Sequence, residues 1–414
     1  MVATDWAAAK LGDVAEFDSG HRNSEDAEPT GQYPFFTCSI EVLRHSEFDF
    51  DTEAVIMAGN NAEAVFHLQY YKGKFAARQR TYIITANPMR ADARFLYYAL
   101  HKLQPLFAAQ SQGTTTKFVT IGMLRNAPLS LPTILEQRAI ARVLGSLDDK
   151  IELNRRMNQT LEEICRALFK FWFIDFGPVR AKMEGRWKKG ESLPGMPADM
   201  WDLWPNEFEE SEIGEIPKGW KLSAVGTETK TVLGGTPSRV NPSYWTSGTV
   251  GWINSGEVNR FRIVEPTEWI TEEAVSNSAA KPLPAHTTVL AITGATIGQV
   301  SITETPTTTN QSVVGVLSTA ELPTEFLYLW VRSRMPDLIA GQTGGAQQHI
   351  NKNDVNELPL LVPPQSIMSR FLALSEPLFS RIRVGEFESL ALKELRDALL
   401  PKLLSGEIRV KVDS

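Results

Sequence analysis

The chain carries the same sequence pattern twice. The segment Phe95–Leu100 (FLYYAL) recurs as Phe326–Val331 (FLYLWV), a shift of 231 residues. The same shift carries other blocks along with it: Gln112–Thr114 onto Thr343–Gly345, and Pro128–Pro132 onto Pro359–Pro363. Solenoid repeats have periods of only a few tens of residues. The pattern therefore predicts two copies of a whole domain, an arrangement that suits a ligand with two half-sites.

Each copy reads as a mixed, strand-rich domain, over residues 1–132 and 218–362. Short apolar runs bounded by Gly, Pro and Asn indicate strands, among them Thr81–Thr85, Thr288–Ile292 and Ser312–Leu317. Each domain also has one helical pattern, over residues 91–106 and 324–339. Trp6 matches Trp220 at a shift of only 214, so the second domain should hold an insertion before Phe326. The predicted fold class is α+β.

A long helix is predicted after each domain. Over residues 133–176, one position recurs every seven residues, at Ile140, Leu147, Asn154, Leu161 and Leu168. A second series lies three residues further on, at Val143, Met157, Ile164 and Phe171. This spacing is typical of a coiled coil, in which a buried Asn such as Asn154 selects one register.

The second helix, over residues 364–405, is less regular. It has two apolar stripes: Phe371, Leu374, Leu378 and Ile382, then Leu392, Leu395, Leu399 and Leu403. Gly385 lies between them, and glycine inside a helix costs about 1 kcal/mol relative to alanine, so a bend or break is predicted there. The two helices are expected to pair antiparallel with each other.

Net charge does not exclude a polyanionic partner. The chain carries −7 overall, but the segment from Asp199 to Glu215 holds seven carboxylates and no Lys or Arg. Outside it the charges balance. This segment is preceded by a basic cluster of Arg180, Lys182, Arg186, Lys188 and Lys189. The cluster is either a phosphate-binding surface or a solvated tether.

Motifs for catalysis or metal binding are missing from the sequence. Cys38 and Cys165 form no Cys/His pattern, so no disulfide or zinc site is expected. No phosphate loop is present. Val240–Tyr244 (VNPSY) resembles the Asn-Pro-Pro-Tyr loop of amino-methyltransferases, but it lacks the second Pro, and Asn-Pro is common in turns. We therefore expect a binding protein with no catalytic residue and no metal site, cytoplasmic, without a signal peptide or a membrane span.

The central region resembles the specificity (S) subunits of Type I restriction-modification systems. The resemblance begins with Ala167–Gly185, Leu193–Met196 and Ile213–Trp220. It continues in Leu233–Pro237, Gly294–Gly298, Thr309–Gln311 and Lys402–Gly406, and the motifs and their duplicated order agree along the whole chain.

The resemblance implies a non-catalytic reader of double-stranded DNA that acts in phage defence. Two target-recognition domains (1–132 and 218–362) would each read half of an asymmetric target. Helices 133–176 and 363–408, joined by a central linker at 177–217, would set the spacing and dock two methyltransferase (M) subunits. Restriction (R) subunits would join for cleavage. Adenine methylation, S-adenosylmethionine, ATP and Mg would belong to the partners, so no cofactor is expected in this chain.

One departure from the family concerns the helix starts. The first helix keeps Leu135–Gln137 (LEQ) after its proline, whereas Pro363–Met368 (PPQSIM) lacks the acidic pair. The two helices therefore need not grip their M subunits alike. The residues predicted to bind partners are Ile140, Leu147, Asn154, Leu161, Leu168, Leu378, Leu392 and Leu399.

Candidate DNA contacts are polar or basic residues in loops, because base edges are read by such side chains and phosphates by Lys or Arg. In the first domain they are His21, Arg22, Asn23, Asn60, Asn61, Lys72, Lys74, Arg78, Gln79, Arg80 and the segment Gln112–Lys117, including Thr115 and Lys117. In the second they are Thr236, Ser238, Arg239, Asn254, Ser255, Thr296, Asn310, Gln311, Gln347, Gln348 and His349. Arg78-Gln79 and Asn310-Gln311 occupy matching places.

Two other classes of protein remain open from sequence. One is a paired-domain scaffold that binds proteins through its coiled coil and never touches DNA. The other is a DNA methyltransferase in its own right, which rests only on Asn241–Tyr244.

Overall fold

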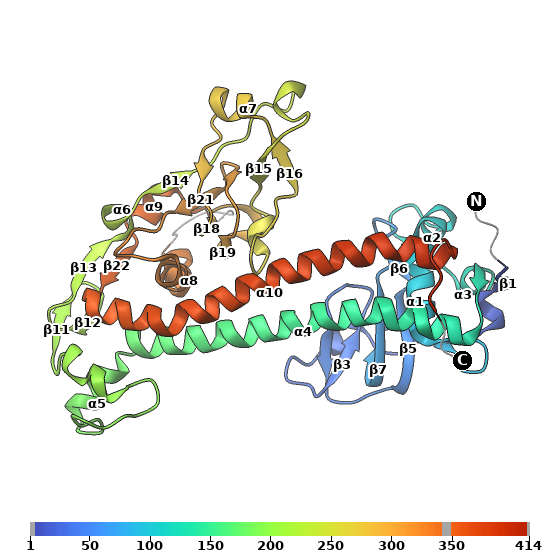
Figure 1. Ribbon diagram of the computed structural model, residues 1–414, viewed down its shortest axis with the longest axis horizontal. Coiled ribbons are helices and arrows are strands. Elements are labelled where there is room, and N and C mark those ends of the chain that lie inside the picture. Colours follow the sequence, from blue (N-terminus) through green and yellow to red (C-terminus); the bar gives the residue numbers. More distant parts are fainter. Residues whose placement is uncertain (1–4, 342–348, 412–414) are drawn as a thin grey trace. The chain divides into compact units, whose positions relative to one another are not determined.

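The computed structural model describes residues 5–341 and 349–411. Three sequence predictions lie outside these residues: the repeat match at Thr343–Gly345 and the candidate contacts Gln347 and Gln348. The chain divides into two compact units, Met1–Glu152 with Leu390–Ser414, and Leu153–Ser389. Each unit contains one strand-rich domain and a segment of both long helices (Figure 1).

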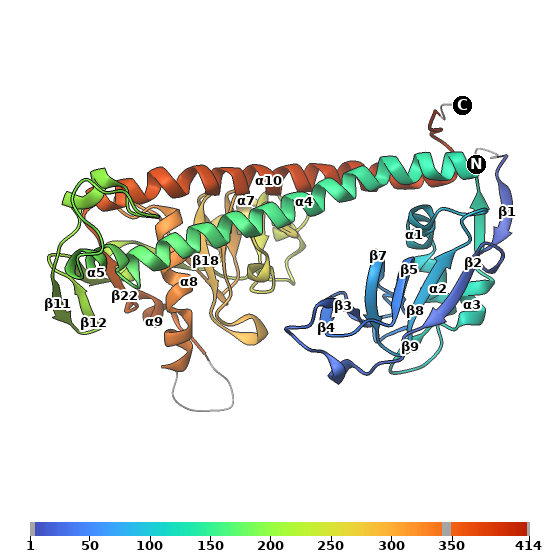
Figure 2. The same cartoon turned by 90° about the horizontal axis from the view of Figure 1, so that it is seen from below.

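The first unit is built on a six-stranded sheet of order β2-β8-β5-β7-β3-β4. The strands are β2 (Ala15–Ser19), β8 (Thr81–Ala86), β5 (Phe50–Ala58), β7 (Leu68–Ala77), β3 (Tyr33–Phe36) and β4 (Leu43–His45). All neighbours are antiparallel except β3 and β7. Figure 2 shows helix α1 (Ala93–Lys102) between this sheet and the long helices. Alternate residues of β5 face opposite ways, so Val55 and Met57 join the α1 core and Ile56 packs on the other face.

The second unit repeats the first four strands of this order. Its sheet runs β14-β21-β18-β19, with β14 (Thr231–Leu233), β21 (Val313–Val316), β18 (Thr287–Ala291) and β19 (Val300–Thr303). Helix α8 (Thr324–Ala340) takes the place of α1. Strand β13 (Lys221–Ala224) pairs antiparallel with β22 (Pro359–Val362), just as β1 (Ala7–Lys10) pairs with β10 (Pro128–Leu131). The duplication predicted from sequence is therefore confirmed in the topology.

The second unit also contains a second sheet, which accounts for its greater length. This sheet has the order β16-β15-β20-β17. Its parts are β15 (Val250–Ile253), β16 (Glu268–Ile270), β17 (Pro282–Leu283) and β20 (Thr307–Thr309), with α7 (Glu272–Asn277) packed nearby. All of these elements precede Phe326, so the insertion lies in the part of the domain that the sequence predicted.

Two long helices, α4 (Ile134–Phe173) and α10 (Gln365–Ser405), run side by side in Figures 1 and 2. In the second unit Asn158 contacts Ile382, and the rings of Phe169 and Phe371 lie 6.0 Å apart. Residues further along α4 contact residues with lower numbers in α10, so the two helices pair antiparallel, as predicted. Helix α10 continues through Gly385, so the predicted break is wrong.

The buried seam of α4 differs in part from the predicted one. Ile140 and Asn154 are buried, but the second buried series lies four residues further on, not three: Leu144, Asn158, Cys165 and Trp172. Ile164, predicted to be in the seam, is 50% exposed, and Leu374 and Leu395 of α10 are also exposed. Apolar residues occupy the predicted series, whereas the buried series includes the polar Asn158, so sequence periodicity favoured the wrong series.

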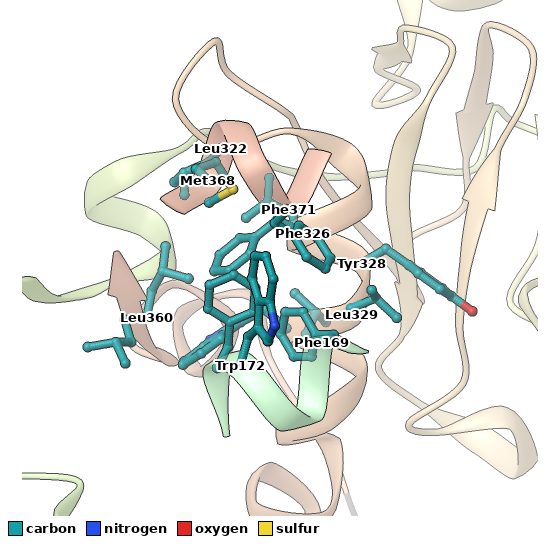
Figure 3. Close-up of a cluster of buried hydrophobic side chains, with 14 of the residues drawn as sticks. Phe169, Trp172, Leu322, Phe326, Tyr328, Leu329, Leu360, Met368 and Phe371 are labelled. Atoms are coloured by element: carbon teal, nitrogen blue, oxygen red, sulfur yellow. The ribbon is translucent and has the colours of Figure 1, made fainter. Parts of the chain in front are cut away.

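Residues 177–217 fold onto the second unit's core, so of the two alternatives for the basic cluster the solvated tether is wrong. They form α5 (Gly177–Met183) and the hairpin of β11 (Phe208–Ser211) and β12 (Gly214–Pro217). Their residues Trp187, Met196, Met200 and Trp204 are buried in the same core as Trp172 and Phe371. Figure 3 shows that core, where Phe169 and Trp172 of α4 meet Phe326 of α8, Leu360 of β22 and Phe371 of α10.

The remaining short elements complete the two units. They are α2 (Gln104–Gln110), α3 (Ile121–Arg125), α6 (Val225–Glu228), α9 (Lys352–Asn356), β6 (Asn60–Asn61) and β9 (Lys117–Phe118). Within the described residues, none of the helices combines the length and the apolar character needed to cross a membrane.

Candidate nucleic-acid interface

Loops from distant parts of the first domain meet at one end of its main sheet. The amide of Gly20 donates to the carbonyl of Thr81 at 3.0 Å, and that of His21 donates to Ala77 at 3.1 Å. The amide of Gly59 donates to Arg80 at 2.8 Å, and that of Val119 donates to Gly59 at 2.9 Å. Strand β6 then pairs with β9, which sets Asn61 opposite Lys117.

The second domain makes the same four backbone hydrogen bonds. The Gly234 amide donates to the Val313 carbonyl at 3.2 Å, and the Gly235 amide donates to the Thr309 carbonyl at 2.8 Å. The Ile292 amide donates to the Ser312 carbonyl, and the Ile350 amide donates to the Ile292 carbonyl, both at 3.0 Å. Each bond joins the repeat counterparts of the first domain's bond, with shifts of 214 for the first loop and 231 to 233 for the others. The two loop clusters are therefore structurally equivalent.

These clusters bring together many of the residues predicted to contact DNA. The first cluster contains His21, Asn60, Asn61, Arg78, Gln79, Arg80 and Lys117, and the second contains Thr236, Asn310, Gln311 and His349. Gln79 and Gln311 are exposed at equivalent positions. Gln311 Oε1 accepts a hydrogen bond from the Thr236 hydroxyl at 2.6 Å, and Gln79 Nε2 lies 3.4 Å from the His21 carbonyl. Both amides are held in place yet keep hydrogen-bonding capacity toward solvent.

The two clusters differ in charge. Arg78, Arg80 and Lys117 give the first cluster three cations, and the counterparts Asn310 and Ser312 in the second cluster are neutral. Arg80 has a positive φ of 64° in the turn closed by the Thr81 amide on the Arg78 carbonyl. The first cluster is therefore better suited to phosphates, and the second to neutral hydrogen bonding.

Four predicted contacts are occupied by other protein groups. Arg22 is largely buried, with its guanidinium 2.7 Å from Asp49 and 3.3 Å from Glu47, and these two carboxylates raise its pKa. Arg239 forms two hydrogen bonds with Glu268, at 2.5 and 3.0 Å, and lies 3.5 Å from the centre of the Trp245 ring. These pairings make both arginines poorer candidates for base contacts.

The other two are lysines of strand β7. Lys72 pairs with Glu53 at 2.9 Å, and Lys74 lies over the Phe48 ring. Both precede Ala77, the residue at which β7 reaches the loop cluster. They therefore belong to the strand and not to the converging loops.

The remaining candidates lie in loops around the clusters. Asn23 begins the turn Ser24–Asp26, and Thr115 is exposed in the loop before β9. Ser238 accepts a hydrogen bond from the Trp245 indole, and Thr296 ends the short helix Gly294–Thr296. Asn254 and Ser255 follow β15, and the Asn254 side chain accepts a hydrogen bond from the Gly256 amide at 2.8 Å. Their contacts with DNA stay predictions.

The sequence reading missed Thr293 and Ser312. They are the counterparts of Asn60 and Arg80 in the second cluster, where Ile292 joins their loops. A shift of 232 or 233 applied to the first domain's candidates would have identified both.

Asn241–Tyr244 forms a capped turn. The Asn241 carboxamide accepts a hydrogen bond from the Ser243 amide at 3.2 Å, and Pro242 starts the short helix Pro242–Tyr244. This is the ordinary structural role of Asn-Pro. The motif that suggested methyltransferase chemistry is thus explained by local structure.

The long helices expose other apolar residues than those predicted to bind partners. Ile140 is buried in the core of the first unit and Asn154 is buried against α10, so their side chains do not reach the surface, which corrects that prediction. Leu147, Leu161, Leu168, Leu378, Leu392 and Leu399 are only partly exposed. More exposed large apolar residues are Leu135, Leu153 and Ile164 on α4, and Leu374, Val384, Phe387 and Leu395 on α10.

The two long helices differ from each other at their first turns, at residues that lie inside the protein. The buried Gln137 carboxamide accepts a hydrogen bond from the Asp92 amide and donates to the Arg90 and Pro132 carbonyls. Its counterpart Met368 is buried in an apolar core. The difference between the repeats at this position is therefore one of core packing.

Comparison with known proteins agrees with this architecture. The family described as the Type I restriction modification DNA specificity domain matches residues 3–163 and 217–372. The HindI specificity subunit of Haemophilus influenzae is 29% identical over 339 residues, covering 72% of this chain and 73% of that protein. The MjaIX specificity subunit of Methanocaldococcus jannaschii is 27% identical, covering 99% of this chain and 95% of that protein.

A solved structure shares the fold. The S subunit of a Type I restriction-modification system from M. genitalium superposes with a TM-score of 0.58 at 16% identity, covering 97% of both chains. The family match covers more than half of the residues and places the chain in the Type I restriction modification DNA specificity family. The chain is a specificity subunit of such a system, the component that recognises DNA sequence.

Proposed function

We propose that each unit reads one half of a bipartite, asymmetric DNA target through its loop cluster. The observation that carries this proposal is the set of four matching backbone hydrogen bonds, which builds the same loop platform twice. The loops on the two platforms carry different side chains, for example Arg78-Gln79 in one and Asn310-Gln311 in the other. Equivalent platforms with different side chains would read two different half-sites.

The proposal extends to the partners. Two M subunits would dock along the long helices, and R subunits would join for cleavage. The exposed apolar residues of α4 and α10 support a docking role, because a partner packed along these helices would remove their side chains from water. Adenine methylation, S-adenosylmethionine, ATP and Mg would be handled by those partners, and this chain would contribute no catalytic group or cofactor.

Domain replacement tests the reading of half-sites. The full chain, assembled with its M subunits, receives the first target-recognition domain of a relative, and methylated adenines are mapped on genomic DNA. We expect one half of the target to change while the other half and the spacing stay the same. A change in both halves after a single replacement would refute independent readers. Methylation that stays unchanged would favour a scaffold that does not touch DNA.

A further inference from the structure

Helices α4 and α10 face each other at positions that the repeat makes equivalent. The shift of 231 residues relates Asn154 to Gly385 and Asn158 to Ser389. The Asn154 Nδ2 atom lies 3.4 Å from the Gly385 carbonyl oxygen and 3.3 Å from the Ser389 hydroxyl. The two helices therefore meet through equivalent positions of the repeat. At these positions α4 has the amides of Asn154 and Asn158, whereas α10 has the small residues Gly385 and Ser389.

The two helices approach each other closely at Gly385. A Cβ atom on Gly385 would lie 2.7 Å from Asn158 Oδ1 and 2.9 Å from Asn158 Nδ2, closer than real Cβ contacts. Asn154 and Asn158 are both fully buried, so Asn158 has little room to move away. The glycine that looked like a helix breaker is therefore a steric requirement of the pairing.

Both amides use this close approach to bind the opposite helix. Asn158 Nδ2 donates to Glu386 Oε1 at 2.8 Å and lies 3.3 Å from the Ile382 carbonyl oxygen. Asn154 Nδ2 donates to Glu388 Oε2 at 2.9 Å. Sliding either helix by one turn would put Ile382 or Ser389 where Gly385 now lies and would separate buried donors from these acceptors. Buried polar groups without partners are strongly disfavoured.

We propose that Asn154 and Asn158, acting with Gly385 and Ser389, form a register lock between the two helices. The lock needs amides on one helix and small residues on the other, and it admits a single alignment. If the helices also space the two half-sites that the proposed function assigns to the two units, the lock fixes the length of the DNA spacer that the protein accepts.

A double-mutant cycle on the full chain tests the lock without DNA. Alanine is normally the better helix residue, yet Gly385→Ala should lower the Tm by about 4 °C or more because its Cβ meets Asn158. Adding Asn158→Ala removes the clash, so the double variant should be clearly more stable than the sum of the single changes predicts. Val384→Ala, at the exposed neighbouring position, is the control and should change the Tm little. Additive effects, or a Tm raised by Gly385→Ala, would overturn the lock.

Mapping methylated adenines adds a readout for the spacer. With M subunits present, Gly385→Ala should lose methylation at the natural spacing, and the Gly385→Ala/Asn158→Ala variant should regain part of it. A non-additive Tm cycle with unchanged methylation would support the lock and count against the helices as the spacer. An additive Tm cycle would count against the lock whatever the methylation shows.

Discussion

The guanidinium of Arg262 lies 3.0 Å from the carboxylate of Glu162, and their side chains are 0% and 5% exposed. Glu304 lies 3.7 Å from the same guanidinium and also pairs with Arg383 of α10 at 3.0 Å. Arg332 of α8 pairs with Glu162 at 2.6 Å. In the second unit, this buried ionic cluster connects the strand-rich domain to both long helices.

Removing Arg262 should strongly destabilise the second unit. Breaking a buried ion pair leaves the partner carboxylates uncompensated, which costs about 3–5 kcal/mol, so Arg262→Met should lose about that much free energy of unfolding in urea. Arg370→Met is the matched control, because Arg370 pairs with Asp199, both side chains are about half exposed, and such surface pairs contribute about 0–1 kcal/mol. Equal losses in both variants would contradict the role of the buried cluster.

The stability of the helix pair should depend on the charge of Glu386. Burial raises the pKa of Glu386 in the folded state, although its hydrogen bond from Asn158 acts the other way. A raised folded-state pKa gives stability that is complete below the unfolded-state pKa and is lost as the pH rises through the folded-state pKa. Glu386→Gln keeps the acceptor for Asn158 without the charge.

Glu386→Gln should therefore raise the Tm at pH 7.5, and the gain should shrink as the pH falls toward 4.5. Thermal unfolding at several pH values measures it. Glu394→Gln, on the exposed face of the same helix, is the control and should alter the Tm little at either end of the range. A gain that grows as the pH falls would show that the sign is wrong.

Gln79 and Gln311 should each determine one half of the DNA target. Gln79→Ala and Gln311→Ala should each weaken binding of the assembled complex by about 1–3 kcal/mol if the amide meets a base edge. Each variant should also relax the base preference in its own half-site, measured by binding to a panel of single-base target variants. Gln365→Ala, at the exposed start of α10, is the control. Relaxed preference in both half-sites from one substitution would contradict the assignment.

Arg78 and Arg22 should behave differently although both are loop arginines of the first domain. If Arg78 contacts a phosphate, Arg78→Gln should weaken DNA binding for all sequences and reduce the slope of log K against log salt by about 1. Arg22→Ala should instead cost about 1.5–3 kcal/mol of unfolding free energy, because its charged hydrogen bonds to Asp49 are lost. A stable Arg22→Ala protein with a reduced salt slope would reverse these two roles.

The sequence by itself determined the features that depend on local pattern. The duplication, the strand and helix classes, the antiparallel helix pair and the family could all be predicted, because hydrophobic period and repeated motifs are written in neighbouring residues. It also placed Gln79 and Gln311 at equivalent positions, because the repeat shift is a property of the chain alone.

The tertiary structure decided which groups meet. Gly385 was expected to break a helix, but the opposite helix requires it there, because Asn158 fills the space that a side chain would need. Arg22 and Arg239 read as exposed cations, but Asp49 and Glu268, distant in sequence, occupy their guanidinium groups. Whether a polar side chain is available to a ligand depends on partners brought close only by folding, and no local pattern encodes that distance.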